Sequence, residues 1–423
     1  MGHPRCRQLT KVGQVNAPVC HLALRTPLRL IALCIALSGL SFTAACGERG
    51  SGTPDASVQG EPDAGQTSSD GGQTGSDGGT GDAGTEPLFG DPFTLTPFDK
   101  VRINSHSDQP NFQQADAPFD WGNISKASVK LIVDLDTTCY PFSKWQQDPP
   151  PEGHNWPPLC DAFDRTFTFT INPAATPEDP PGFEVVRAIT PFGGPLHLEI
   201  DLTDLANGLP GAHVLRTRIE TWSDGAGQVS GSNGGWFVTA RIEVTPGRPP
   251  ASVAAVIPLY QGNQTESGEG GRISFDIPEG TVETRLEYRV TGHGGPNSGG
   301  DSACIGPFDE FCRRQHELYV DDVRVDNFEA WRDDCAQLCT VVSSPGPFGG
   351  TIQYCQENPT GAQQSVRAPR ANWCPGSLTP PRVVYPDALA QAGGHTFSWR
   401  INKIGAGGVW NVSAWAIAYG VRK

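Results

Sequence analysis

The chain has 423 residues, a formal net charge of −15 and 12 cysteines. This acidic balance argues against nucleic acid as a partner, because binding to phosphates requires a basic surface. Part of the negative charge lies in a polar N-terminal segment and carries no information about the fold. The residues that follow this segment are numerous enough for two domains of ordinary size.

The first 46 residues have the pattern of an export signal. Basic residues precede an apolar run, Leu30 to Leu40, that is too short to span a bilayer comfortably. The run is followed by Thr43-Ala-Ala-Cys46, which resembles the lipidation site of bacterial lipoproteins although Thr43 departs from it. We expect an exported protein, lipidated at Cys46 and anchored in the outer membrane of a bacterium. The alternative is cleavage after Ala44 or Ala45, which would release a freely secreted protein.

Residues 47–87 form a second N-terminal segment, rich in Gly, Ser, Thr and Asp. Such a composition buries too little apolar surface to offset the entropy of ordering a chain. We therefore predict a disordered tether. It would hold the remaining chain away from a membrane, or it would be a spacer without further function.

The body of the chain carries the alternation of polar and apolar residues that is typical of half-buried antiparallel strands. Predicted strands are 128–133, 166–171, 196–202, 236–244, 286–290 and 395–401. Glycine (51) and proline (38) supply turns, and 326–337 is the one short helix that we expect. Many short strands predict sandwiches or jelly rolls. A Pro/Gly break at 245–250 divides the body into domains 88–248 and 249–423.

Eight of the cysteines lie in this body, and an even number in an exported chain indicates disulfides. Their spacing does not determine the pairing. Zinc is the competing interpretation, because Cys335 and Cys339 are near neighbours. No adjacent Cys-x-x-Cys or His pair completes a structural zinc site, so we expect no metal.

Three short acidic stretches stand far apart in the chain: Cys160-Asp-Ala-Phe-Asp-Arg165, Ile219-Glu-Thr-Trp222 and Phe308-Asp-Glu-Phe-Cys312. Each places a carboxylate beside an aromatic ring, a cysteine or both. Rings stack on the apolar faces of a sugar, carboxylates hydrogen-bond its hydroxyls, and a neighbouring ring can raise the pKa of a carboxyl. The three stretches therefore indicate a site that processes sugars.

These stretches, together with Arg187-Ala-Ile-Thr-Pro-Phe192 and Ala371-Asn-Trp-Cys-Pro-Gly376, resemble the peptide-N-glycosidase F family of bacterial amidases. The resemblance extends from about Phe98 to the C-terminus. It implies an all-β fold of two adjacent eight-stranded antiparallel jelly-roll domains, with the site on their mutual face. It also implies the disulfides Cys139 to Cys160, Cys304 to Cys312 and Cys335 to Cys374, which leave Cys339 and Cys355 to close a further loop.

The resemblance also assigns the site residues. It implies that Asp164 is the principal catalytic acid, Glu310 the second essential acid and Glu220 the third, which holds the glycan. Arg165 and Trp222 match sugar-binding neighbours. Further groove residues are Phe163, Trp373 and Arg370, although each Trp could instead belong to the core. The sequence departs from the family at Phe163 and Phe311, where Trp is usual, and at Thr291, where the family example has an aromatic residue.

The activity that the resemblance implies is hydrolysis of the amide between N-acetylglucosamine and asparagine in N-glycoproteins or N-glycopeptides. We expect a monomer that needs no cofactor and contacts a membrane only through its lipid anchor. One alternative is a catalytically silent glycan-binding lipoprotein, which the missing indoles leave open and the three retained acids argue against. Copper monooxygenases share the two-jelly-roll architecture, but they need clustered histidines and a methionine, and the only methionine here is Met1.

Overall fold

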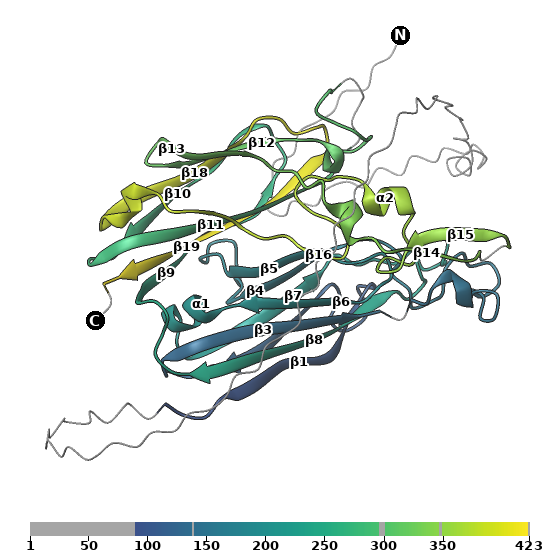
Figure 1. The fold of residues 1–423 in the computed structure, drawn as a ribbon, viewed down its shortest axis with the longest axis horizontal. Coiled ribbons are helices and arrows are strands. Elements are labelled where there is room, and N and C mark those ends of the chain that lie inside the picture. Colours follow the sequence, from purple (N-terminus) through teal and green to yellow (C-terminus); the bar gives the residue numbers. More distant parts are fainter. Residues whose placement is uncertain (1–88, 138, 296–300, 347–348, 422–423) are drawn as a thin grey trace, which may run out of the picture. The chain divides into compact units, whose positions relative to one another are not determined.

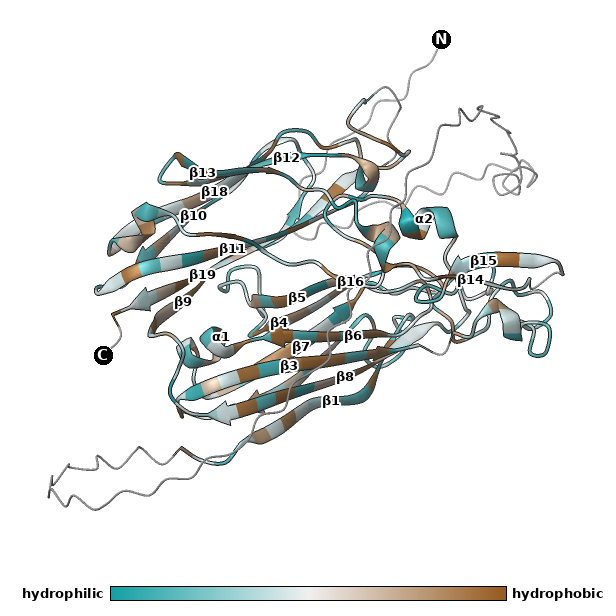
Figure 2. Ribbon diagram, viewed as in Figure 1, coloured by the Kyte–Doolittle hydropathy of each residue, from teal (hydrophilic) through white to brown (hydrophobic). Residues whose placement is uncertain are grey.

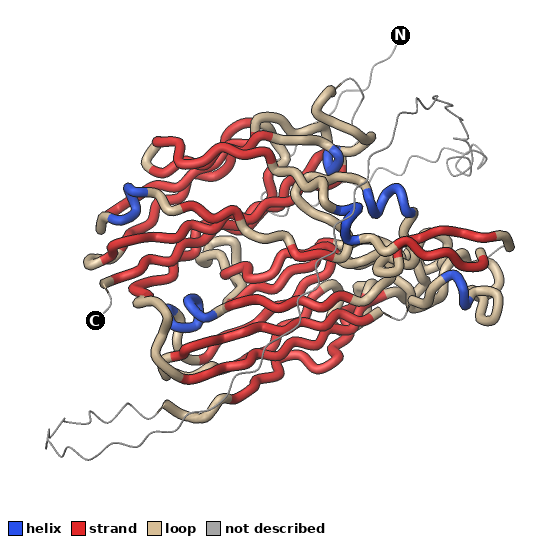
Figure 3. Tube along the Cα trace, in the orientation of Figure 1, coloured by secondary structure: helices blue, strands red, loops and turns tan. Residues whose placement is uncertain are grey.

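The computed structural model describes residues 89–421 except 138, 296–300 and 347–348. The predicted signal (1–46), its Cys46 and the tether (47–87) therefore lie outside the described residues. Strands account for most of the regular structure, and the helices are short (Figure 3). Among the described residues, no helix has both the length and the apolar character that crossing a bilayer requires.

The first eight strands form two antiparallel sheets, which lie together in the lower part of Figure 1. These strands are β1 (Phe93–Asn104), β2 (Gln114–Asp120), β3 (Lys126–Asp136), β4 (Thr166–Ile171), β5 (Phe183–Ile189), β6 (Leu196–Asp201), β7 (Ala212–Ile219) and β8 (Gly235–Pro246). One sheet has the order β1-β8-β3-β6. The other has the order β5-β4-β7-β2 and is extended beyond β5 by β16 (Ser377–Leu378), from the second half of the chain.

Eight later strands form a second pair of antiparallel sheets, of orders β10-β18-β12-β13 and β17-β11-β19-β9. They are β9 (Val253–Gln264), β10 (Gly268–Ile277), β11 (Thr281–Gly294), β12 (Gln315–Val320), β13 (Val323–Glu329), β17 (Arg382–Val384), β18 (Gly393–Ile401) and β19 (Gly408–Gly420). The remaining strands, β14 (Val341–Pro345) and β15 (Thr351–Cys355), pair as a hairpin. The predicted fold, two adjacent eight-stranded antiparallel jelly rolls, is confirmed. We propose the division between residues 248 and 249 as the domain boundary.

The described helices are single turns or little more. They are α1 (Thr203–Gly208), α2 (Gln363–Arg367) and the 3₁₀ turns η1 (Phe142–Lys144), η2 (Asp309–Phe311), η3 (Cys335–Leu338) and η4 (Asp387–Ala390). The helix that we predicted at 326–337 is wrong. Its first part belongs to β13, which pairs with β12 as far as Glu329, and only η3 is helical. From β13, Phe328 packs against the core of the second jelly roll. Tertiary packing therefore decides the structure of this segment, whatever its local apolar pattern suggests.

The alternation of residue types explains why these segments are strands. Val129, Leu131, Val133 and Leu135 of β3 are fully buried, and brown and teal positions alternate along this strand in Figure 2. Each such side chain contributes roughly 1.5–3 kcal/mol by its burial. Every position of β5 is buried, because one face covers the core of the first jelly roll and the other meets the second.

The sheet that contains β4 and β5 faces the sheet that contains β9 and β19. The Arg187 Nη1 group of β5 donates to the Asn411 carbonyl of β19, and Gln261 of β9 donates to Thr170 Oγ1 of β4. Trp415 of β19 packs into the core of the first jelly roll. The contact between the two jelly rolls is therefore partly apolar and partly polar, and the polar part borders the candidate site.

The four disulfides have the predicted pairing: Cys139–Cys160, Cys304–Cys312, Cys335–Cys374 and Cys339–Cys355. In the described part of the chain, one group of potential metal ligands lies close together, namely Asp334, Cys335 and Cys374. Its two sulfur atoms are joined to each other, so neither is a thiolate that could bind zinc.

Candidate active site

A cleft of about 310 Å³ lies between the two jelly rolls and collects most of the predicted site residues. Asp164, Arg165 and Glu220 reach it from the first jelly roll, and Glu310 and Trp373 reach it from the second half of the chain. The structure thus brings together the carboxylates of Asp164, Glu220 and Glu310, which lie far apart in the sequence. Phe163, Trp222 and Arg370 do not line the cleft directly but contact residues that do.

Arg370 links the two principal acids. Its Nη1 group donates to Glu310 Oε1 at 2.8 Å, and its Nη2 group lies 3.9 Å from Asp164 Oδ2. The Arg370 side chain is 1% exposed, whereas the Asp164 and Glu310 side chains remain 18% and 23% exposed. A buried cation therefore lies behind two carboxyls that still reach the solvent of the cleft.

The guanidinium of Arg370 is itself held firmly. Its Cζ atom lies 4.5 Å from the centre of the Phe311 ring and 4.4 Å from that of the Trp373 ring. Its Nη2 group also donates to the carbonyl and the hydroxyl of Ser365, both at 2.9 Å. Cation–π contacts and two hydrogen bonds leave this group little freedom. The charge that faces the two acids is therefore preorganised.

Burial raises the pKa of both acids. Desolvation is the main cause for Asp164 and for Glu310, and the positive charge of Arg370 opposes it in both. The charge of Asp164 also raises the pKa of Glu310. Because burial raises the pKa of each acid, both retain a proton to higher pH than exposed carboxyls would. Such a pair suits proton transfer.

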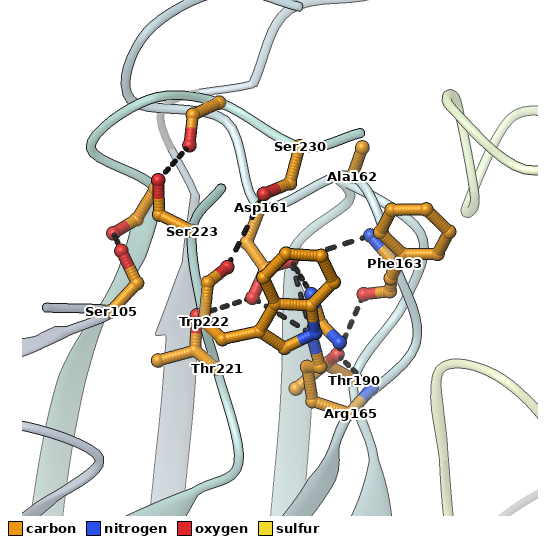
Figure 4. A network of polar contacts seen from close by, with 12 residues as sticks. Ser105, Asp161, Ala162, Phe163, Arg165, Thr190, Thr221, Trp222, Ser223 and Ser230 are labelled. Carbon is orange, nitrogen blue, oxygen red and sulfur yellow. Dashed lines mark hydrogen bonds and ion pairs between the residues drawn. The ribbon is translucent and has the colours of Figure 1, made fainter. Parts of the chain in front are cut away.

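Asp161 is a buried carboxylate that ties two of the acidic stretches together (Figure 4). It accepts two hydrogen bonds from Arg165 Nε, at 3.1 and 3.0 Å, and one from Arg165 Nη2 at 2.9 Å. It also accepts from the Thr221 hydroxyl and, at 3.3 Å, from Trp236 Nε1. Thr221 lies between Glu220 and Trp222, so Asp161 fixes both stretches to one point. Sequence reasoning missed this role, although Asp161 stands within the first acidic stretch.

Arg165 is consequently oriented by Asp161 rather than by Asp164. Its Cζ atom lies 5.2 Å from the Phe163 ring centre and 5.4 Å from the Trp222 ring centre, so the guanidinium stacks between them. Trp222 is 39% exposed, whereas Trp373 is only 2% exposed and donates its indole N–H to the Gly292 carbonyl. Of these two tryptophans, Trp222 has the open face that a sugar could stack on.

We expect Asp161→Asn to impair the site more than the fold. Asparagine keeps the size of the side chain but loses the charge that holds Arg165, and the Arg165 guanidinium, whose side chain is 11% exposed, keeps partial access to solvent. The activity of the site should fall by about 10- to 100-fold, which corresponds to the loss of charged hydrogen bonds. A kinetic assay beside a thermal melt tests this expectation. Full activity in Asp161→Asn would contradict it.

The neighbouring residue Asp309 holds the turn that positions Glu310. Asp309 is fully buried and accepts hydrogen bonds from Arg314 Nη2, from Gly405 N at 3.0 Å and from Trp410 Nε1 at 2.8 Å. These bonds anchor the turn η2, and the Cys304–Cys312 disulfide closes it. Asp309 therefore supports the turn, while Glu310 is the carboxylate that faces the cleft.

Glu220 lies at the outer part of the cleft. Its side chain is 50% exposed and lies 3.8 Å from Arg218 Nη2. It also lines a smaller cavity of about 130 Å³, which shares Asn263 and Asn411 with the main cleft. This exposed position suits a carboxylate that holds a ligand hydroxyl.

His293 is a cleft residue for which the sequence analysis assigned no role. Its ring stacks on Trp373 with the ring centres 5.3 Å apart, and its Nε2 atom lies 2.8 Å from Thr291 Oγ1. Burial, together with the positive charges of Arg187 and Arg370, lowers the pKa of His293 to about 3. The imidazole is therefore neutral at physiological pH.

The structure therefore consists of two packed antiparallel jelly rolls with an acidic cleft between them. The family described as "Peptide-N-glycosidase F, C terminal" matches residues 262–417. A curated relative, peptide-N(4)-(N-acetyl-beta-D-glucosaminyl)asparagine amidase F of Elizabethkingia miricola, is 26% identical over 259 residues. That match covers 57% of this chain and 62% of the relative, so the chain spans less than two thirds of the relative's length.

Solved structures agree on the fold. The structure of PNGase F, a glycosylasparaginase from Flavobacterium meningosepticum, superimposes with a TM-score of 0.57 at 18% identity, covering 78% of this chain and 96% of that one. PNGF-II gives a TM-score of 0.56 at 18% identity, covering 78% and 66%. The chain is thus similar to peptide-N-glycosidase F in sequence over its second half and in fold over both jelly rolls.

Proposed function

We propose that the protein is an amidase that hydrolyses the bond between N-acetylglucosamine and the asparagine side chain of N-glycoproteins or N-glycopeptides. The observation that carries this proposal is the meeting of Asp164 and Glu310, one from each jelly roll, across Arg370. The products are an intact glycan, first as a glycosylamine, and a peptide with aspartate in place of asparagine. The name of the curated relative, an asparagine amidase, supports the same activity.

The different surroundings of the three acids suit them to different roles in the reaction. Hydrolysis needs a water molecule at the amide carbonyl and a proton on the departing nitrogen. Asp164, whose pKa burial raises, manages this proton transfer. Glu310, which Arg370 holds at 2.8 Å, orients the water or the first sugar. Glu220, at the exposed rim, accepts hydrogen bonds from glycan hydroxyls, and the open ring of Trp222 stacks on a sugar face.

A released-glycan assay tests the proposal. The purified protein is incubated with a denatured N-glycoprotein in water labelled with heavy oxygen, and the peptides are analysed by mass spectrometry. We expect loss of the whole glycan, an aspartate at the former glycosylation site and heavy oxygen in its carboxylate. Binding without release would instead indicate a silent glycan-binding protein. Cleavage that leaves a sugar on asparagine would contradict the amidase directly.

We further propose that the protein is an exported, monomeric lipoprotein. The four disulfides are consistent with export to an oxidising compartment. The small residues before Cys46 support lipidation at that cysteine. We expect the mature chain to begin at a lipid-modified Cys46 and to partition with membranes, and Cys46→Ser to shift it to the soluble fraction. An unmodified N-terminus beyond residue 46 in the wild-type protein would refute the anchor.

A further inference from the structure

The catalytic cleft continues into a smaller cavity of about 130 Å³, which we call the outer pocket. The residues that line both spaces are Thr166, Glu220, Asn263 and Asn411. Asp164 and Glu310 line the cleft but not the outer pocket. The outer pocket is therefore reached from the cleft past Glu220, on the side away from the catalytic acids.

A row of threonines on β4 forms one wall of the outer pocket. Thr166 and Thr168 are two positions apart, so their side chains lie on the same face of this strand. Thr168 lines the outer pocket alone. Because β4 begins directly after Asp164 and Arg165, the step from Thr166 to Thr168 leads about 6.6 Å further from the catalytic acid. Such a step suits one additional sugar residue.

The far end of the outer pocket is closed. Thr170 is the next residue of the same row, and its Oγ1 atom accepts a hydrogen bond of 3.1 Å from Gln261 Nε2 of β9. This bond joins the two jelly rolls just beyond Thr168. A cavity that is open towards the cleft and closed at its other end can hold the end of a short row of sugars, but it offers no path for a longer chain.

The outer pocket contains polar side chains that a ligand can reach. Asn263 and Asn411 are directly opposite each other on β9 and β19, and such cross-strand neighbours share one face of a sheet. Their amides and the hydroxyls of Thr166 and Thr168 form no hydrogen bond with another side chain or backbone group in the described part of the chain. Asn263 is exposed and the other three are partly exposed. Two amides and two hydroxyls offer both donors and acceptors, as sugar hydroxyls require.

The charged groups of the outer pocket compensate one another. Arg187 Nε lies 2.6 Å from Glu184 Oε1, and both side chains are buried. Arg218 Nη2 lies 3.8 Å from Glu220 Oε1. Each cation of the described lining thus has a carboxylate beside it, so the outer pocket favours a neutral ligand. Its described lining also has no aromatic ring, and a sugar is held there by its hydroxyls rather than by stacking.

We propose that the outer pocket binds the third sugar of the glycan, counted from asparagine, which is a mannose in N-glycans. This inference rests on the proposed function: the first sugar lies at the catalytic acids and the second at Glu220, so the next one enters the outer pocket. The amides of Asn263 and Asn411 and the hydroxyl of Thr168 exchange hydrogen bonds with its hydroxyls. The outer pocket therefore favours glycans that extend beyond their two N-acetylglucosamine residues.

Binding of free oligosaccharides tests the outer pocket without catalysis. The full chain is titrated by calorimetry with the disaccharide of two N-acetylglucosamine residues and with the trisaccharide that carries one further mannose. Neither contains an asparagine amide, so the protein has no bond of that kind to hydrolyse. We expect the trisaccharide to bind two- to tenfold more tightly, as one neutral hydrogen bond provides. Equal affinities, or binding of neither, would overturn the proposal.

Thr168→Val is the test variant. Valine has nearly the shape of threonine and suits a strand, and the lost hydroxyl has no partner among the described residues. We expect the ratio of the two affinities to fall towards one. Asn263→Ala, at an exposed position, should lower the same ratio and serves if Thr168→Val folds poorly. Trp222→Ala is the matched control: Trp222 does not line the outer pocket, so both oligosaccharides should weaken by the same factor. A ratio that neither Thr168→Val nor Asn263→Ala lowers would refute the assignment.

Glycan release separates a failure of this inference from a failure of the amidase. Glycopeptides with two or three sugars are prepared on a short and on a long peptide, and kcat/KM is compared. We expect the third sugar to raise kcat/KM, and Thr168→Val to reduce this gain on both peptides. No release, together with the expected binding ratio, would remove the amidase and retain the outer pocket. Release that is indifferent to the third sugar, or a Thr168→Val effect that follows peptide length, would overturn the outer pocket and retain the amidase.

Discussion

Replacing Asp164 with Asn should lower the rate of glycan release by about 10²- to 10⁴-fold, the usual contribution of a general acid–base group. Asparagine keeps the shape of the side chain but cannot exchange a proton with water or with the departing nitrogen. The acid faces the cleft with 18% of its side chain exposed, and its Oδ2 atom lies 3.9 Å from Arg370 Nη2. Single-turnover rates on a glycopeptide measure this effect without interference from product release.

The fold should not suffer from the same substitution. Burial raises the pKa of Asp164 in the folded chain above its ordinary value of 3.8. The folded state then binds the proton more tightly than the unfolded state, so stability falls as the pH rises from that value to the raised pKa. Asp164→Asn removes this loss, and we expect it to melt no lower than the wild type at pH 7. The relative gain should shrink as the pH falls towards 3.8.

Glu220→Gln is the matched control for Asp164→Asn. Glu220 is half exposed and lies at the rim, so its loss should weaken glycan binding and raise KM while kcat is largely retained. A fully active Asp164→Asn protein would remove Asp164 from the mechanism. Equal loss of kcat in both variants would mean that the roles of the two carboxylates are not separated as proposed.

The strands were predictable because their pattern is local. Alternation over 166–171 and 395–401 reports which side chains face a core, and the structure has strands at Thr166–Ile171 and Gly393–Ile401. The segment 326–337 misled the same reasoning, because Phe328 faces a core equally well from a strand. The first part of this segment is a strand because it pairs with β12, and a local sequence pattern carries no information about that pairing.

The candidate site was predictable only through the family resemblance. Spacing alone does not place Asp164 and Glu310 at one arginine, since their positions in the sequence differ by 146. The supporting carboxylates show the same limit. Asp161 and Asp309 lie three and one positions before Asp164 and Glu310 in the sequence, but their partners Thr221, Trp236 and Trp410 come from distant strands and segments. A buried acid and an exposed one look alike until the tertiary structure assigns their hydrogen bonds.

Replacing Arg370 with Met should change both the rate and its dependence on pH. Methionine fills the space between the Phe311 and Trp373 rings, with 4.5 and 4.4 Å contacts in the wild type, but it carries no charge. The charge of Arg370 lowers the pKa of both Asp164 and Glu310, in opposition to burial. Its removal raises both pKa values further. The acidic limb of kcat/KM, which reports ionisation in the free enzyme, should therefore move to higher pH.

At neutral pH the same variant should lose about 10- to 100-fold in kcat/KM, because Glu310 also loses a charged hydrogen bond of 2.8 Å. Arg370→Lys separates the two effects. Lysine retains the positive charge but lacks the planar fork that pairs with Glu310 and stacks between two rings. Its rate should fall while its acidic limb stays near that of the wild type. An unshifted limb in Arg370→Met would show that this arginine does not set the ionisation of the two acids.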